Sequence, residues 1–290
     1  DMAPFLAVNL DVAEAAGFDG PPATWSELRE YAKKMTTADQ AGVVLQATLA
    51  PVDINIFEGI AYANGGRFLD EETETIMING PGFVDALQLI VDLVNDGSTP
   101  SGLTDIIFKD AATLFAEKKA MMWGGMSWLI RPWYPTDPEG LRWVAAPFPR
   151  PDTVSGKYEA AATIMDPTAA LMIPSTSKQP EAALRYIDFW AQPERLMLWD
   201  GSTIQSRVPA TAAAYKTDSL KQAWPQWVEA FENGTLFEGS LPMPRFNGRA
   251  ECEQFLGKAI QEAILGQRSP QEALDEAAEK AQELYDLLNK

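Results

Sequence analysis

The sequence predicts an α/β fold, because short apolar runs alternate with amphipathic segments of helical spacing along its 290 residues. Hydrophobic residues make up 46% of the chain, which is enough to bury a sizeable core. No repeat of the length that defines solenoids or propellers is visible, and no low-complexity segment interrupts the pattern. We therefore expect one large unit or two modest ones.

The first half of the chain carries local signals for the ends of its helices. Thr24 followed by Glu27 forms a capping-box pattern, so a helix should begin near Trp25. The sequence Asn64-Gly65-Gly66 ends another helix, as a C-terminal glycine cap would. In order, the pattern predicts strand 3–10, helix 11–17, helix 25–35, strand 42–45, helix 53–64, a helix from 79–81 through 95, helix 106–118, and strand 121–123 opening into a glycine-rich turn.

The second half begins with a different composition. Residues 132–166 are rich in Pro, Gly, Trp and polar residues, so we expect an extended crossing with one short strand at 143–146. Ser269 and Pro270 match the cap and first position of a terminal helix. The remaining expected elements are strand 169–173, helix 180–199, a further element at 208–215, and helices 250–266 and 270–289.

Composition excludes several functional classes. The chain has no histidine, which removes the commonest metal ligand and the usual general base at neutral pH. Its net charge of −18 would repel nucleic acid and anionic membrane surfaces. The single cysteine, Cys252, fits a small apolar helix residue. We expect no catalytic residue, no metal, no cofactor and no nucleic-acid partner.

Several short motifs occur together in a fixed order, and together they span essentially the whole chain. They resemble the sugar-type extracellular solute-binding proteins of bacterial ABC transporters, the family of maltose-binding protein. Each motif alone recurs by chance, so the resemblance depends on their shared order and spacing. The motifs are Asn9-x-Asp11 with Ala16-Gly17, Pro21-Pro22-x-Thr24-Trp25-Ser26-Glu27-Leu28, Asn64-Gly65-Gly66, Phe115 with Lys118, Ala120, Met121 and Gly124, Ser177-Lys178 before Glu181-Ala182, Arg207-Val208-Pro209-Ala210, Gly266, Ser269-Pro270 and Glu272-Ala273-Leu274.

The resemblance implies a fold like the type II periplasmic binding proteins, formed mainly by the C-terminal lobe with a strand-helix remnant of the N-terminal lobe. Residues 1–163 would form the first part of the C-terminal lobe with a hinge strand at its start. Residues 164–206 would form the N-terminal-lobe remnant, and residues 207–290 the helical second part of the C-terminal lobe. Family members begin with a strand-helix lobe that this sequence lacks, so we expect it to be part of a longer protein or a misread start.

Sugar binding requires flat apolar faces and planar polar groups that match paired hydroxyls. The resemblance places Trp128, just beyond the predicted turn Gly124-Gly125-Met126, where the family stacks a sugar ring on an aromatic side chain, and we expect Gly124 and Met126 of this turn to contact the ligand as well. Asp53 and Asn55 match positions that face the cleft from the start of a helix. A packing role for Trp128 and a helix-capping role for Asp53 are the open alternatives.

Five further residues border the expected cleft. Met2 and Phe5 lie on a strand that resembles an inter-lobe crossing, and Ser206 with Arg207 lies on another. Structural roles at a hinge would explain these four equally well. Arg249 would donate two hydrogen bonds from its guanidinium to neighbouring hydroxyls of a sugar. The alternative is that it is solvated or ion-paired, as surface arginines usually are.

The resemblance implies a non-enzymatic, substrate-binding component of an ABC importer. It would capture a sugar or oligosaccharide in the periplasm or outside the cell and deliver it to the permease subunits. Contact with a membrane would occur only through the permease or a lost lipid anchor. No stretch approaches the roughly 20 apolar residues of a spanning helix, and the start lacks a signal sequence, so we expect a soluble chain.

Three alternatives stay open at this point. The chain could be a binding-incompetent lobe or a protein-interaction module with an apolar patch around Met126 and Trp128. It could be a carbohydrate-active enzyme using Asp53 and Glu58, although these lie about 140° apart around a helix and would not share one face. The ligand class is also open: the lack of a Lys/Arg-dense loop disfavours phosphate, whereas the acid excess permits cations.

Overall fold

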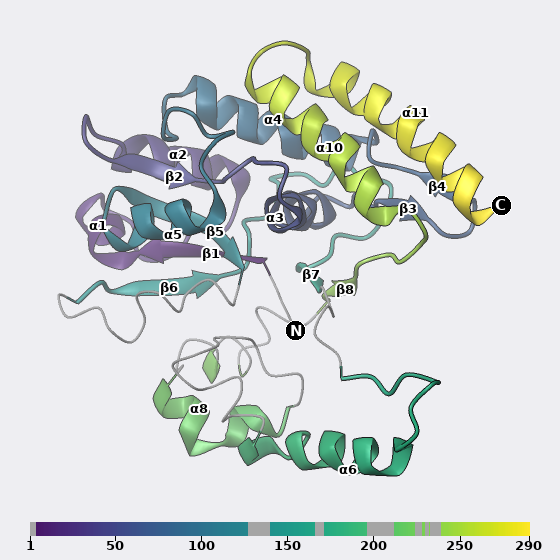
Figure 1. Ribbon diagram of the computed structural model, residues 1–290. Coiled ribbons are helices and arrows are strands. Elements are labelled where there is room, and N and C mark those ends of the chain that lie inside the picture. Colours follow the sequence, from purple (N-terminus) through teal and green to yellow (C-terminus); the bar gives the residue numbers. More distant parts are fainter. Residues whose placement is uncertain are drawn as a thin grey trace.

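The computed structural model describes residues 4–126, 140–165, 171–195, 212–223, 228–229, 232 and 239–290. Strands and helices alternate along these residues, which confirms the α/β prediction (Figure 1). The strands are β1 Pro4–Asn9, β2 Ala41–Val44, β3 Leu69–Asp70, β4 Thr75–Ile76, β5 Ala120–Met126, β6 Trp143–Ala146, β7 Ile164–Met165 and β8 Leu241–Pro242.

The described helices alternate with these strands along the chain. Their bounds are α1 Leu10–Ala15, α2 Trp25–Met35, α3 Pro51–Ala63, α4 Pro81–Asn95, α5 Phe108–Ala116, α6 Pro180–Trp190, the 3₁₀ turn η2 Ala214–Lys216, α8 Asp218–Ala223, α10 Arg249–Ile264 and α11 Pro270–Asn289. Helix α2, strand β6 and helix α11 begin and end at the predicted residues. Apart from β5, α6 and the strands of the second half described below, the other boundaries moved by one or two residues, as fraying ends commonly do.

The core of the described chain is a four-stranded mixed sheet in the order β2-β5-β1-β6. Strand β5 runs parallel to β2 and antiparallel to β1, with Pro4 opposite Met126. Every residue of β1 and β5 is buried, which explains their continuous apolar runs. The predicted turn at 124–126 is wrong: these residues continue β5 because β1 pairs with them.

Helices α2, α3 and α5 pack on this sheet, α4 and α10 pack on α3, and α11 packs on α4 and α10, so that α3 lies between the sheet and α10 (Figure 1). The capping box at Ser269 is confirmed, since its hydroxyl accepts from the Glu272 amide at 3.3 Å. At α2 the Thr24 hydroxyl accepts from the Glu27 amide, but the Glu27 carboxylate accepts from the amide of Ala23 instead of Thr24. Both helix starts therefore follow from their local sequences.

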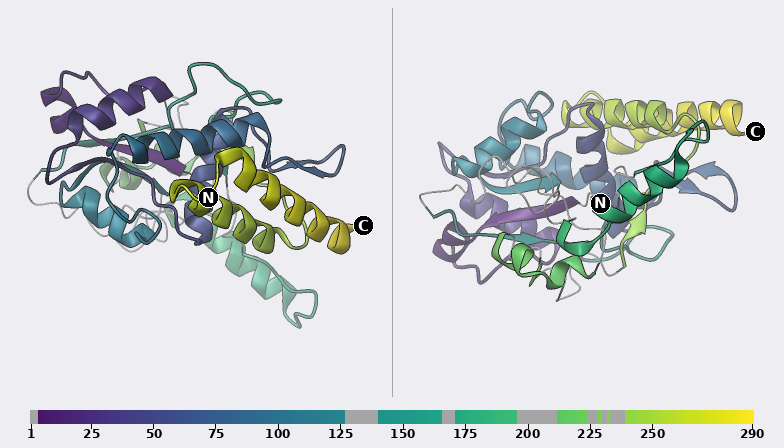
Figure 2. Two further views of the ribbon diagram at one scale, coloured as in Figure 1. Left: turned by 90° about the horizontal axis from the view of Figure 1, so that it is seen from above. Right: turned by 60° about the horizontal axis from the view of Figure 1, so that its bottom comes forward.

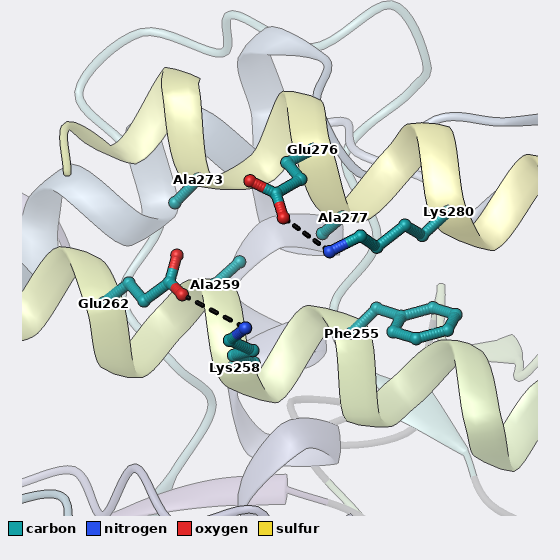
Figure 3. A pocket seen from close by; sticks show the side chains of 8 residues that line it. All are labelled: Phe255, Lys258, Ala259, Glu262, Ala273, Glu276, Ala277 and Lys280. Carbon is teal, nitrogen blue, oxygen red and sulfur yellow. Dashed lines mark hydrogen bonds and ion pairs between the residues drawn. The ribbon is translucent and has the colours of Figure 1, made fainter.

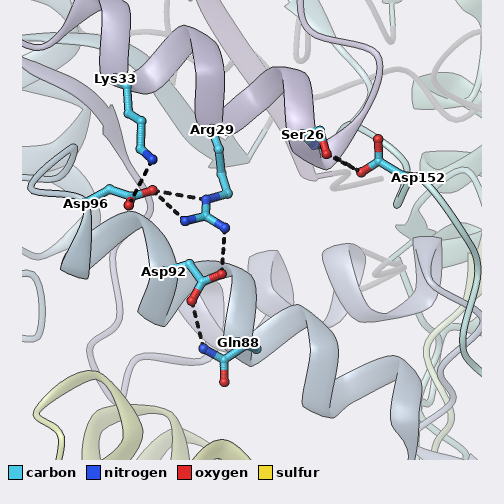
Figure 4. Close-up of polar contacts among 7 residues, drawn as sticks. All are labelled: Ser26, Arg29, Lys33, Gln88, Asp92, Asp96 and Asp152. Atoms are coloured by element: carbon cyan, nitrogen blue, oxygen red, sulfur yellow. Dashed lines mark hydrogen bonds and ion pairs between the residues drawn. The ribbon is translucent and has the colours of Figure 1, made fainter.

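Polar side chains fasten α2 to its neighbours (Figure 4). Arg29 pairs with Asp92 of α4 and with Asp96, the residue that caps the end of α4, each at 2.8 Å, and Lys33 also reaches Asp96. At the start of α2, Asp152 accepts from the amide and the hydroxyl of Ser26 and so caps this helix from a distant loop. Exposed pairs contribute little stability each, so their main effect is to set the orientation of α2.

Helices α6 and α8 lie on the far side of β7 and β8 from α10 and α11 (Figures 1 and 2). None of the residues of α6 is buried, and Leu184, Tyr186 and Phe189 are about half exposed along it. The apolar spacing correctly predicted a helix here, but no described residue buries the apolar face of that helix.

Two predictions in this region need correction. Residues 171–173 form no strand, and 169–170 lie outside the described residues; the strand at this point is the shorter β7, which pairs in parallel with β8. Helix α6 ends at Trp190 rather than 199, although residues 193–195 are helical again and 196–199 lie outside the described residues. Of the element expected at 208–215, residues 208–211 lie outside the described residues and the last two overlap the turn η2. The division into segments 1–163, 164–206 and 207–290 stays a prediction.

The end of α3 is held by a backbone crossing that leaves no space for side chains. Asn64 is fully buried, and its amide nitrogen donates to Ser155 at 2.8 Å while its oxygen accepts from the Ser155 amide at 3.0 Å. A Cβ added at Gly156 would lie 2.3 Å from the backbone of Gly65, and one at Gly82 would lie 2.5 Å from that of Gly66. The Asn-Gly-Gly motif thus ends α3 and also lets three backbone segments meet.

We predict that Gly156→Ala lowers the free energy of unfolding by about 3 kcal/mol, because the new methyl group collides with backbone that cannot move away. Gly20→Ala is the matched control, since a Cβ there meets nothing within 4 Å, and it should change stability by less than about 0.5 kcal/mol. Urea denaturation measures both. Equal stability of the two variants would show that the crossing is not tight.

Candidate ligand-binding site

Several elements meet at one edge of the sheet. Strands β2 and β5 are parallel, so their carboxyl ends lie together, and the start of β1 joins them because β1 is antiparallel to β5. Helix α3 begins at this edge, following the loop that leaves β2. In open α/β sheets, ligands commonly bind beyond the carboxyl ends of the strands. The polar residues of this edge are therefore the first candidates for a binding site.

Asp53 lies in the first turn of α3 and is only 2% exposed. One carboxylate oxygen accepts from the amide of Thr48 at 3.2 Å and from its hydroxyl. Burial raises the pKa of Asp53 to about 6, although Thr48 and Gln46 act to lower it. Asp53 makes no ion pair with any described residue, and its second oxygen, Oδ1, has no hydrogen-bond partner among them.

Gln46 and Asn55 bring further unmatched polar atoms to the same edge. Gln46, 4% exposed, makes no hydrogen bond within 3.5 Å through Nε2 or Oε1, although its side chain lies near enough to Asp53 to lower the pKa of that carboxyl. Asn55, 5% exposed, has no hydrogen-bond partner for Oδ1 in the described structure. Asn55 precedes Gly59 by one helical turn, and Gly59 faces Pro4 and Thr163, so Asn55 faces the side where β1 begins. Asp53 faces the loop after β2. Together they flank the start of α3 from two sides.

Unmatched buried polar atoms cost on the order of 1–3 kcal/mol each, so native proteins rarely keep several close together. Here four such atoms lie on residues 46, 53 and 55. A ligand that donates and accepts hydrogen bonds would satisfy them. Leu49 of the same loop is 41% exposed and offers an apolar surface beside them. This combination is typical of a site for a hydroxylated small molecule.

Phe5, Gly124 and Met126 lie beneath this edge, inside the core. Phe5 packs edge-on against Trp123 with ring centroids 5.6 Å apart, and Met126 is 1% exposed. A Cβ on Gly124 would come within 2.5 Å of Leu45, so the glycine allows the loop after β2 to pack on β5. The burial of Met126 also shows that this residue forms no exposed apolar patch.

Arg249 is ion-paired, which is the alternative to a sugar contact that the sequence left open. Its guanidinium lies 2.6 Å from Glu58 and 3.3 Å from Glu253, and stacks on Phe68 at 3.6 Å. Glu58 is fully buried and Arg249 is 12% exposed, so the pair joins α3 to α10 in the interior. With its carboxylate bound to Arg249, Glu58 is poorly placed to act as an acid or base beside Asp53.

The other sequence-derived site residues, Met2, Trp128, Ser206 and Arg207, lie outside the described residues, and their ligand contacts stay predictions. Sequence reasoning missed Gln46 and Thr48. A polar residue directly after the apolar run 42–45, at the carboxyl end of a predicted strand, was an available signal for Gln46.

A second surface feature is the groove between α10 and α11 (Figure 3). Its volume is about 20 Å³, roughly the space of one water molecule. The carboxylates along it are paired: Glu262 with Lys258, and Glu276 with Lys280 and Arg268. The groove therefore lacks both the size and the unmatched groups of a solute site.

Comparison with known proteins identifies the family. The sequence profile of the bacterial extracellular solute-binding proteins matches residues 1–195. The chain belongs to this family. Its similarity to sugar-binding members extends over nearly the whole chain: the maltose-bound MalE3 of T. maritima is 26% identical, with a TM-score of 0.78 over 98% of this chain and 71% of that one.

Other solute-binding proteins show the same fold at lower identity. The sugar-binding protein MalE of Xanthomonas citri is 18% identical with a TM-score of 0.79, covering 99% of this chain and 69% of that one. UgpB of Mycobacterium tuberculosis, in complex with glycerophosphocholine, is 16% identical with a TM-score of 0.72, covering 99% and 69%. The fold is thus that of the type II periplasmic binding proteins, as the sequence predicted.

Curated relatives match over part of their length. A Brucella abortus (strain 2308) protein, named for an inferred binding function, is 26% identical over 283 residues, or 94% of this chain and 63% of its own. The sn-glycerol-3-phosphate-binding periplasmic protein UgpB of Agrobacterium fabrum is 31% identical over 101 residues, 33% of this chain and 23% of its own. The chain therefore spans 63% of the length of the Brucella relative.

The family is extracellular, and its matched members are solute-binding proteins rather than enzymes. Within the part of the chain that the structure describes, no helix is long and apolar enough to cross a bilayer.

We predict that Asp53→Asn stabilises the chain increasingly as the pH rises. The pKa of Asp53 in the folded chain is about 6, above its ordinary value of 3.8, so the folded state retains a proton that the unfolded state has lost. The stability contributed by Asp53 therefore falls between about pH 4 and pH 6, by up to about 3 kcal/mol in total.

Urea denaturation of both proteins at pH 4, 5, 6 and 7 measures this difference. We expect the asparagine variant to gain about 2 kcal/mol over the parent between the two extremes. Asp39→Asn, at an exposed aspartate, is the control and should show no such trend. A constant difference across the four pH values would contradict the buried, unpaired state of Asp53.

Proposed function

We propose that this chain captures a sugar, an oligosaccharide or a related polyol, and that the start of α3 forms one wall of its binding site. The observation that carries the proposal is the set of unmatched buried atoms on Gln46, Asp53 and Asn55. Sugar hydroxyls donate and accept hydrogen bonds, so they can satisfy these atoms together. Membership of the solute-binding family supports a binding role, and the matched maltose-bound receptor supports the ligand class.

Delivery to a membrane permease belongs to the same proposal. In this proposal, β7 and β8 connect the part of the chain that holds the four-stranded sheet to the part that holds α6 and α8. These two strands form only a two-residue ladder, so hinge motion there would require few contacts to change. A solute bound at this edge of the sheet would favour a closed arrangement over an open one. The closed form would then be recognised by permease subunits, with no covalent chemistry involved.

The arrangement gives little support to a carbohydrate-active enzyme. Asp53 is held by Thr48, and Glu58 is held by Arg249 at 2.6 Å, so the two carboxylates considered for an acid and base have separate structural partners. Glycoside hydrolysis needs two carboxylates that face one glycosidic bond from opposite sides. Capture without chemical conversion is the simpler function for this site.

We predict a saturable change in tryptophan fluorescence when the chain is titrated with at least one member of a panel of mono-, di- and oligosaccharides. Asp53→Ala and Asn55→Ala should each weaken binding about tenfold or more, because each removes a buried hydrogen-bonding group. Titrations should extend to tens of millimolar, since the chain spans only part of its relatives' length.

The control for this experiment is Asp39→Ala, which removes an exposed carboxylate elsewhere on the chain and should leave the dissociation constant unchanged. Circular dichroism of every variant shows that it is folded. A flat response of the folded parent protein to the entire panel would overturn the proposed function.

A further inference from the structure

The unmatched atoms at the start of α3 are predominantly acceptors. Three of the four are oxygens, namely Gln46 Oε1, Asp53 Oδ1 and Asn55 Oδ1, against a single nitrogen, Gln46 Nε2. Each belongs to a side chain at least nine-tenths buried. A ligand that satisfies them must bring O–H or N–H groups, which a phosphate dianion or a carboxylate lacks.

The same region has no basic side chain in its sequence. No lysine or arginine occurs between Met35 and Gly66, which includes β2, the following loop and all of α3. Strand β5, from Ala120 to Met126, contains none either. Anion sites in proteins usually contain such a side chain or a free helix N-terminus.

Among the described residues, Arg249 reaches α3 from α10, but its guanidinium lies 2.6 Å from Glu58 and 3.3 Å from Glu253, so two carboxylates already offset its charge. The N-terminus of α3 is a further source of positive potential, and Asp53 opposes it. Asp53 lies in the first turn, where a carboxylate interacts favourably with the helix dipole. Its charge is buried at 2% exposure, so water screens it poorly and an incoming anion would experience its repulsion nearly in full.

We propose that Asp53 makes this site charge-selective, so that it accepts neutral hydroxylated ligands and excludes their phosphorylated and carboxylated forms. This inference rests on the proposed function and adds a specificity-determining residue to it. The family contains proteins named for neutral maltose and proteins named for sn-glycerol 3-phosphate. Charge selection by Asp53 would place this chain with the first group.

Matched pairs of ligands test the inference. Glucose, galactose, fructose and glycerol are each compared with a phosphate ester: glucose 1-phosphate and 6-phosphate, galactose 1-phosphate, fructose 6-phosphate and sn-glycerol 3-phosphate. Gluconate and galacturonate serve as carboxylated probes. Isothermal titration at constant ionic strength and pH 8, where Asp53 is ionised because its pKa is about 6, gives the dissociation constants.

We expect each neutral ligand that binds to do so about 100-fold more tightly than its phosphate ester. In Asp53→Asn, which keeps the shape and removes the charge, this ratio should shrink at least about tenfold. Asp39→Asn should leave the ratio unchanged, because Asp39 is exposed and lies outside the site.

Two results would overturn the inference in distinguishable ways. If a phosphate ester binds the parent protein within about threefold of its neutral partner, or if Asp53→Asn leaves the ratio unchanged, charge selection by Asp53 is wrong while sugar capture stands. If phosphate esters bind and no neutral ligand does, or if nothing binds, the proposed function fails and the inference fails with it.

Discussion

The backbone crossing at the carboxyl end of α3 is the constraint on which the rest of the structure depends. Asn64, Gly65 and Gly66 meet the backbone of Gly82 and Gly156 at distances that no Cβ could occupy. The two hydrogen bonds between Asn64 and Ser155 fix the segment that follows β6 against the same point. Because α3 is a rigid rod, fixing this end also fixes the other one, where the candidate site lies at the edge of the sheet.

Two buried carboxylates on α3 have contrasting surroundings. Glu58, in the middle of the helix, has a buried arginine partner 2.6 Å away, as a charge in the interior requires. Asp53, one and a half turns earlier, has only Thr48 and a neutral neighbourhood, and its pKa rises to about 6 as a result. A chain selected for stability alone would have paired or replaced it. This contrast is the reason that we propose a binding role for Asp53 and a structural role for Glu58.

Local sequence rules predicted much of this fold, and long-range pairing accounts for what they missed. Helix α11 could be predicted to the residue because Ser269, Pro270 and Glu272 lie next to one another in the chain. Strand β7 was missed because its two residues become a strand only by pairing with β8, and β5 was cut short because its last residues depend on β1. Asp53 and Asn55 were identified from the resemblance. The partner of Arg249, 191 residues away, could not be predicted from spacing.

We propose that the start of α3 is the wall that contacts the solute, and NMR of the side-chain amides can observe this contact. In a ¹⁵N-labelled sample titrated with the sugar that binds, the account predicts that the amide groups of Gln46 and Asn55 and the backbone amide of Gly124 change their chemical shifts. The amide of Gln282, which is bound to Asp286 on α11, should stay unchanged. Shifts confined to α10 and α11, with Gln46 and Asn55 unaffected at saturation, would contradict the account.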